Sequence, residues 1–436
     1  MATILAYTSP ALGHLLPMSA LLSELSGRGH RIHVRTLSAG VPTGRRLGFH
    51  TEAIDARIEA VTMEDWRAPN GLAALKVSIG VLCGRAAYEV NDLRRALAQV
   101  QPEVLIIDVN CWGAQSVADA AGIPWLVFSP YTPFLTSRGA PPFGPGLKPL
   151  PGVVGRLRDS AVRPVVTGLL ERAMLPALNK VRADVGAPEV RPSDEFLRRA
   201  ALMLVATGEP FEYPHPDWGA SVQLIGPCAV DPGPHTVPDW LAAIDEPIVL
   251  VTISSEPQAD GRLVLAAMDA LADDPVHVVA TFPAGLPENV PVPANATVRG
   301  FVPHGPVLDR AVCAVTHGGM GATQKALAKA VPVCVVPFGR DQLEVARRVE
   351  VSCCGTRLPV KKLTPARLRD GAAGDTTGTC ETRGHPSGAR GHRPRLMNLV
   401  ELIEQRIISA QQHSGPKPMP GDKAVQAVTG QQPGAD

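Results

Sequence analysis

The segment from Val315 to Leu327, VTHGGMGATQKAL, has the clearest chemical signal in the sequence. An apolar run ends in a histidine and three glycines, and the residues that follow are typical of a helix. Glycines let a backbone approach a ligand closely, and successive N–H groups at the start of a helix bind anions. A tight turn with a capping histidine is the alternative interpretation. The predicted phosphate site comprises His317, Gly318, Gly319, Gly321, Ala322 and Thr323.

This glycine pattern does not indicate a dinucleotide-binding site. The spacing of the glycines differs from the GxGxxG fingerprint of dinucleotide-binding turns. An oxidoreductase that uses a nicotinamide cofactor would account for the alternation of strands and helices, but it should carry that fingerprint.

Asp341 and Gln342 follow at the end of the next predicted strand, in VPFGRDQ. A carboxylate beside an amide can accept hydrogen bonds from vicinal hydroxyls and donate to them, as the binding of a sugar requires. The alternative is that Asp341 is the N-cap of a helix that begins with DQLEVARR.

In the first half of the chain, two polar residues also lie at or after the ends of predicted strands. His14, in GHLLP, lies in the first strand-to-helix turn, where a helix N-terminus would disfavour the imidazolium and keep a neutral base. Asp108 ends the strand LIID and would fix the tautomer of His14 if the two side chains touch. A structural histidine and a helix-capping aspartate are the alternatives.

Alternating strands and helices must position these residues. Residues 2–37 have a strand–helix–strand pattern that recurs over 102–130, and a similar pattern restarts after the Pro- and Gly-rich stretch 227–246. Fully apolar strands between helices predict parallel sheets that are covered on both faces. The predicted fold class is therefore α/β, with two doubly wound Rossmann-like domains. Ligands are expected at the carboxyl ends of strands, in a cleft between the domains.

The motifs THGGMGATQKALAKAVPVCVVPFGRDQLEVARR and GHLLP resemble those of the inverting, nucleotide-sugar-dependent glycosyltransferases of family 1. This is the UDP-glycosyltransferase superfamily, which has the GT-B fold, and its bacterial branch that modifies macrolides and other natural products is most similar. The resemblance extends over about residues 1–370. It implies an acceptor-binding domain at 1–226, a linker at 227–246 and a nucleotide-sugar-binding domain at 247–395.

The resemblance also implies roles for the polar residues. His14 would deprotonate the acceptor hydroxyl with Asp108 as its partner, so that a sugar passes from a UDP- or dTDP-sugar to a small lipophilic acceptor by direct displacement. A long Pro-rich loop at 130–155 is either a wall for such an apolar ligand or a variable surface insertion.

The implied donor site lies in the second half of the chain. The loop around His317 would hold the diphosphate, and Asp341 with Gln342 would hold the sugar hydroxyls. Further donor contacts are expected at Ser254 and Ser255, near the diphosphate, and at the backbone of Val302, near the nucleobase.

No metal ion or other cofactor is expected, because the chain has no D-x-D pair and the phosphate site would supply a cation's electrostatic stabilisation. The net charge of +1 is mixed in sign along the chain, so it gives no argument for a nucleic-acid or a membrane-surface partner. No signal peptide or transmembrane segment is predicted, and the eight cysteines form no CxxC pair. We therefore expect a cytoplasmic enzyme, monomeric or homodimeric, whose partners are its small-molecule acceptor and donor.

Two features depart from the family pattern. Lys325 stands where many relatives carry a glutamate that binds the nucleotide ribose. Residues 371–395 contain no Val, Ile, Leu, Met or aromatic residue, and a local frameshift restored near Leu396 would account for this composition; sequencing of the coding DNA tests it. A helix is predicted over 396–412 and a disordered tail over 413–436. A non-catalytic or decayed donor-binding helper is the alternative function.

Overall fold

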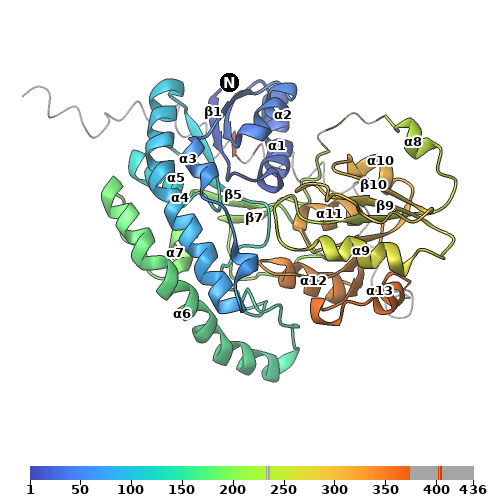
Figure 1. Cartoon of the computed structure of the whole chain (residues 1–436). Helices are drawn as coiled ribbons and strands as arrows, with labels where there is room; N and C mark the ends of the chain where they lie inside the picture. Colours follow the sequence, from blue (N-terminus) through green and yellow to red (C-terminus); the bar gives the residue numbers. More distant parts are fainter. Residues whose placement is uncertain (232, 234–235, 374–400, 402, 405–436) are drawn as a thin grey trace, which may run out of the picture.

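The computed structural model describes residues 1–231, 233, 236–373, 401 and 403–404. The chain forms two parallel sheets with helices packed on their faces (Figure 1). The first sheet has seven strands in the order β3-β2-β1-β4-β5-β6-β7, and the second has six in the order β10-β9-β8-β11-β12-β13. The predicted α/β class with two doubly wound domains is confirmed.

The first sheet and its helices are built from the N-terminal half of the chain. Its strands are β1 (Thr3–Tyr7), β2 (Arg31–Thr36), β3 (His50–Ala53), β4 (Val104–Asp108), β5 (Trp125–Ser129), β6 (Leu202–Val205) and β7 (Val222–Leu224). Its helices are α1 (Leu12–Gly27), α2 (Val41–Arg46), α3 (Ala56–Ala60), α4 (Gly71–Val100), α5 (Trp112–Ala121), α6 (Gly152–Val185) and α7 (Ser193–Arg198), with short 3-10 turns η1 (Ser38–Gly40) and η2 (Asp65–Arg67).

The second sheet begins after a connection that includes the predicted linker 227–246. Its strands are β8 (Ile248–Thr252), β9 (His277–Thr281), β10 (Ala296–Arg299), β11 (Ala311–Thr316), β12 (Val333–Val335) and β13 (Gly355–Arg357). The accompanying helices are α8 (Asp239–Ala242), α9 (Gly261–Ala270), α10 (His304–Leu308), α11 (Met320–Ala328), α12 (Gln342–Val351) and α13 (Pro365–Ala372), with the 3-10 turn η3 (Val360–Lys362).

Each sheet has an apolar core on both of its faces. In β1, Leu5 belongs to the cluster shared with α4 and α5, whereas Ile4 belongs to the cluster shared with α1. Each buried aliphatic side chain of this kind contributes roughly 1.5–3 kcal/mol to folding. Tyr131 packs against core clusters of both domains, so the two halves share part of their apolar packing.

The two longest helices were not predicted from the sequence. Helix α6 begins at Gly152, inside the predicted loop 130–155, and continues through Pro164 and Pro176. Among the described residues, α4 is the one helix long and apolar enough to cross a membrane. It contributes buried side chains to the N-terminal core and packs against α5 and α6.

Several predictions concern residues outside the described ranges. Most of the atypical segment 371–395 and the whole predicted tail 413–436 lie there. Of the predicted helix 396–412, only residues 401, 403 and 404 are described. Among these, Ile403 is buried against the N-terminal core, and Glu404 accepts hydrogen bonds from Arg28 and His30.

Candidate active site

His14 and Asp108 lie side by side at the carboxyl ends of β1 and β4. His14 is in the first turn of α1, and its Nδ1 lies 2.7 Å from Oδ2 of Asp108, which is fully buried. Because an ionised carboxylate only accepts hydrogen bonds, Nδ1 carries the hydrogen and Nε2 keeps its lone pair. The backbone N–H of Asn110 donates to the second oxygen of Asp108 at 2.9 Å, which fixes the carboxylate in this orientation.

The sequence prediction for the pKa of His14 is wrong in direction. Burial lowers this pKa, as a helix N-terminus also would, but the charge and hydrogen bond of Asp108, together with the charges of Glu256 and Asp341, outweigh burial. The pKa of His14 is therefore raised. The helix was visible in the sequence, whereas these three carboxylates come from three separate segments and converge only in the fold.

The turn between β11 and α11 is shaped by its glycines. Gly318 has φ +95°, a conformation that side chains rarely adopt. A Cβ on Gly319 would lie 2.6 Å from Nε2 of His317, so a glycine is needed beside that ring. A Cβ on Gly321 would meet nothing within 4 Å. The first N–H groups of α11 have no intrahelical partner and no side-chain cap, which leaves donors for an anion.

His317 directly follows β11 and has a buried, neutral side chain. Burial, helped by the nearby charge of Arg340, lowers its pKa to about 4. Its Nδ1 is buried without a hydrogen-bond partner among the described residues. The ring can therefore act as a neutral N–H donor, but it does not supply a positive charge at neutral pH.

Asp341 and Gln342 have different surroundings. Asp341 is the N-cap residue of α12, yet its side chain makes no capping hydrogen bond. Gln342 is buried, and its amide oxygen accepts from the N–H groups of Phe338 (2.7 Å) and Gly339 (3.1 Å). Its amide nitrogen donates to Gln258 at 2.5 Å. The amide of Gln342 is thus engaged inside the protein, where it shapes the loop that precedes Asp341.

Arg340, which was not predicted from the sequence, joins the two domains at this site. Its guanidinium contacts both carboxylate oxygens of Asp65 in the N-terminal domain, at 2.8–3.2 Å, and Glu256 in the C-terminal domain at 2.5 Å. A positive φ of 53° at Arg340 directs the loop toward this contact. Asp65 and Arg340 are separated by 275 residues, so no local pattern indicates their pairing.

Comparison with known proteins identifies the family. The C-terminal domain model of the erythromycin biosynthesis protein CIII-like family matches residues 265–382. The chain is 33% identical over 383 residues to 4'-demethylrebeccamycin synthase of Lentzea aerocolonigenes, which covers 84% of the chain and 90% of that relative. The chain belongs to the bacterial family 1 glycosyltransferases.

Other relatives and solved structures agree with this assignment. Demethyllactenocin mycarosyltransferase of Streptomyces fradiae is 26% identical over 380 residues, 84% of this glycosyltransferase and 78% of the relative. The crystal structure of the kitacinnamycin glycosyltransferase superposes with a TM-score of 0.67 at 22% identity, over 93% of this chain and 99% of that one. VinC in complex with dTDP gives 0.63 at 19% identity, over 95% and 100%. The fold is GT-B.

The remaining predicted donor residues are Ser254, Ser255 and Val302. The Ser254 hydroxyl accepts from the Glu256 N–H and the Gln258 amide, at 3.1 and 2.9 Å, so this side chain holds its own loop. Ser255 beside it is exposed. Val302 buries its side chain in the C-terminal core between β10 and α10. Of these three residues, Ser255 has the side chain that is open to solvent.

Lys325, the departure noted in the sequence, pairs with the linker in this glycosyltransferase. Its Nζ lies 2.7 Å from Oδ1 of Asp231. Asp231 also accepts hydrogen bonds from the N–H groups of His304 and Gly305 at the start of α10. Lys325 therefore ties α11 to the linker, and a carboxylate at this position would repel Asp231.

The Pro-rich loop of the N-terminal domain is held by α12 of the C-terminal domain. Oε1 of Glu344 accepts from the N–H groups of Gly144 and Gly146, both at 2.8 Å. Its other oxygen accepts from Arg348 at 2.9 Å, and Arg348 also contacts Glu212 at 2.8 Å. Helix α12, which begins beside Asp341, thus positions the loop that was predicted to be either a wall for an apolar ligand or a surface insertion.

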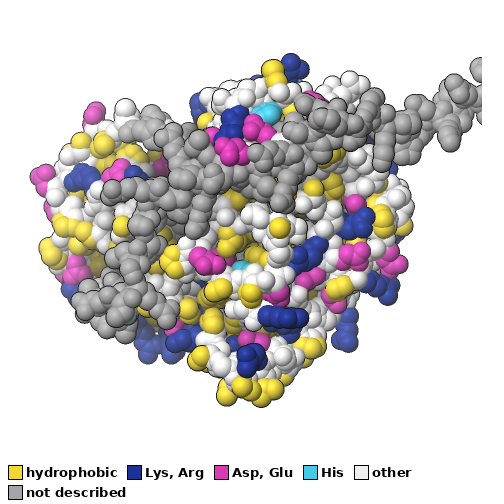
Figure 2. All heavy atoms as spheres, turned by 180° about the vertical axis from the view of Figure 1, so that it is seen from behind, with side chains coloured by type: hydrophobic (Ala, Val, Ile, Leu, Met, Phe, Trp, Pro, Cys, Tyr) yellow, Lys and Arg dark blue, Asp and Glu magenta, His cyan; other side chains and the backbone are white. Residues whose placement is uncertain are grey.

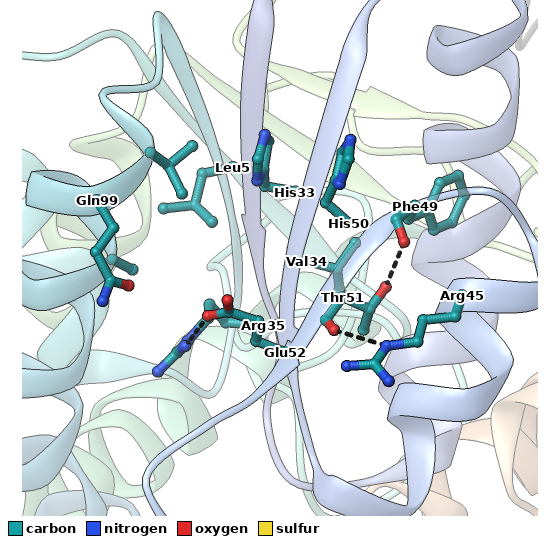
Figure 3. A pocket seen from close by; sticks show the side chains of 12 residues that line it. Leu5, His33, Val34, Arg35, Arg45, Phe49, His50, Thr51, Glu52 and Gln99 are labelled. Carbon is teal, nitrogen blue, oxygen red and sulfur yellow. Dashed lines mark hydrogen bonds and ion pairs between the residues drawn. The ribbon is translucent and has the colours of Figure 1, made fainter.

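A cavity of about 450 Å³ lies elsewhere, against β2 and β3 (Figure 3). His33 and His50 stand side by side on the two strands with ring centroids 4.8 Å apart. Arg35 pairs there with Glu52 at 2.6 Å. None of the predicted site residues lines this cavity, so it is separate from the candidate active site.

Proposed function

We propose that this glycosyltransferase moves a sugar from a UDP- or dTDP-sugar to a hydroxyl of a small lipophilic acceptor, with inversion at the anomeric carbon. The observation that carries the proposal is the contact of 2.7 Å between His14 and Asp108, with Asp341 close enough to affect the pKa of His14. This arrangement brings a candidate base of one domain beside a candidate sugar-binding carboxylate of the other.

The proposed reaction is one displacement. The lone pair on Nε2 of His14 takes the acceptor proton, and Asp108 stabilises the imidazolium that forms. The acceptor oxygen bonds to the anomeric carbon as the bond from that carbon to the diphosphate oxygen breaks. The electron pair leaves with the diphosphate, where N–H groups of α11 and the neutral ring of His317 donate to the developing charge.

We infer that no metal ion is required, because the uncapped N–H groups at the start of α11 would stabilise the departing diphosphate as a cation otherwise does. Asp341 would hold donor-sugar hydroxyls with its uncapped carboxylate. Gln342 would contact the sugar only after its amide exchanged its present partners. The names of relatives support natural-product acceptors, and the dTDP complex of VinC supports dTDP as one candidate nucleotide.

The variant His14→Ala tests the proposal. We expect product formation to fall at least about 100-fold, with donor affinity measured by calorimetry unchanged, because the base contacts the acceptor proton. His50→Ala, an exposed ring in the separate cavity, is the control and should retain parental turnover. The anomeric configuration of the product, determined by NMR, tests inversion.

Parental turnover in His14→Ala would overturn the assignment of the base. If the parent protein bound a nucleotide sugar but transferred none to any acceptor offered, the non-catalytic helper would be favoured instead.

A further inference from the structure

The first half of α6 exposes a regular apolar stripe. Val154, Leu157, Ala161, Val165 and Leu169 recur every three or four residues, so they lie along one face of the helix. Val154 is 70% exposed, Leu157 67% and Val165 61%. Isolated exposed apolar residues are ordinary, but a stripe over four helical turns usually marks a contact surface.

The opposite face of α6 already has partners. Leu170, Ala173, Met174 and Leu178 pack in or against the N-terminal core, where α6 contacts α4 and α5. Helix α6 is thus apolar on two faces and uses only one of them within the described part of the chain. The outer stripe is the face for which the described residues provide no partner.

The charged residues beside the stripe indicate what kind of partner it would bind. The cations between positions 148 and 169 are Lys148, Arg156, Arg158 and Arg163, and the single acid in this range is Asp159, which Arg158 already pairs at 2.7 Å. A symmetric contact with a second copy would bring these cations together without acids to balance them. A surface that is apolar inside and negatively charged outside complements both features.

We propose that this surface, the α6 stripe with its flanking cations, docks on an anionic lipid bilayer. The beginning of α4 adds exposed Leu72, Lys76 and Val77 at the same end of the molecule (Figure 1). Figure 2 shows hydrophobic side chains gathered at this lower end, with Lys and Arg side chains beside them. The Pro-rich loop leads into the stripe through exposed Leu150. A docked molecule would therefore hold that loop at the lipid surface.

Co-sedimentation of the full chain with vesicles tests the proposal. The vesicles are phosphatidylglycerol and phosphatidylcholine in equal amounts, compared with phosphatidylcholine alone. We expect binding to the anionic vesicles, weakened at high salt, and at least about tenfold weaker for Leu157→Gln/Val165→Gln, which removes apolar area. Arg156→Gln should weaken binding about fivefold.

The matched control is Val237→Gln/Leu286→Gln, which removes two equally apolar side chains that are each 51% exposed elsewhere. It should bind vesicles as the parent does. Unchanged melting temperatures show that every variant is folded.

Two results would overturn the proposal. One is a parent protein that does not bind anionic vesicles, or that binds equally well after both stripe substitutions. The other is a dimer, seen by analytical ultracentrifugation, that the stripe substitutions dissociate while vesicle binding is absent; the stripe would then belong to a second copy. Neither readout depends on sugar transfer, so failure here leaves the proposed function untouched.

Discussion

His14 is a base whose strength is set by its neighbours. Asp108 raises the pKa of His14 against the effect of burial. A general base acts in its neutral form, so the transfer rate should fall as the pH falls through this raised pKa. In Asp108→Asn, burial remains while the charge is lost, and the pKa of His14 should drop. We expect the acidic limb of kcat/KM to move to lower pH, with a maximum lower by about 100-fold.

The control for this profile is Asn110→Ala. It removes the side chain that accepts from Tyr131 at 2.6 Å but keeps the backbone N–H that orients Asp108. Its acidic limb should coincide with that of the parent. An acidic limb that Asp108→Asn leaves in place would mean that another group controls the rate.

Glu89 gives a second pH effect, on stability. It lies on α4 and is buried against the start of α5, where it accepts from the N–H of Gly113 at 2.8 Å. Burial raises its pKa from the ordinary 4.5 to about 8. At a pH between these two pKa values, Glu89 therefore keeps its proton in the folded state and has lost it in the unfolded state. Stability should fall as the pH rises from about 4.5 to 8, by up to about 4 kcal/mol.

In Glu89→Gln the side-chain oxygen can accept the same hydrogen bond without titrating. Urea unfolding at pH 5.5 and 8.5 should show a smaller loss of stability for this variant than for the parent. Equal losses in the two proteins would show that Glu89 is ionised in the fold or that its charge is stabilised.

At the scale of elements, a substitution in the turn from β11 to α11 should change fold stability and donor affinity in opposite directions. Gly321 lies in the first turn of α11, and a Cβ there meets nothing. Gly321→Ala should stabilise the fold by about 0.5–1 kcal/mol, since glycine is costly within a helix. The added methyl should also obstruct the proposed diphosphate, weakening donor affinity about tenfold in calorimetry. Gly80→Ala, an equally open position in α4, should leave donor affinity unchanged.

The sequence predicted this turn and its strands because short apolar runs bounded by glycine or proline have the length and flanking residues of buried strands. It did not predict α4 and α6. Helix α6 is apolar on two faces and contains Pro164 and Pro176, so neither periodicity nor breakers indicated a helix of 34 residues. The inward hydrogen bonds of Gln342 were equally hidden, because they depend on the loop at Phe338 and on the distant Gln258.

At the scale of the whole molecule, polar contacts tie the two domains together near the site. Arg340 reaches Asp65, and Glu344 reaches the loop at Gly146. In the C-terminal domain, Arg340 directly precedes Asp341, and Glu344 follows it by three residues. The segment proposed to hold the donor sugar is therefore also the segment that sets the distance between the domains.

Asp65→Ala tests whether this contact maintains the productive arrangement. It removes the partner of Arg340 in the N-terminal domain and leaves Glu256, so Arg340 keeps a counter-charge within its own domain. We expect a loss of about 1.5–3 kcal/mol in unfolding free energy and a larger radius of gyration by small-angle scattering. Turnover should fall while donor affinity stays constant, because the donor site belongs to the C-terminal domain and only its alignment with His14 changes. Glu52→Ala breaks an exposed ion pair within the N-terminal domain and should change none of these quantities. If Asp65→Ala instead weakened donor binding at an unchanged radius, Arg340 would act on the donor directly and not through the domain arrangement.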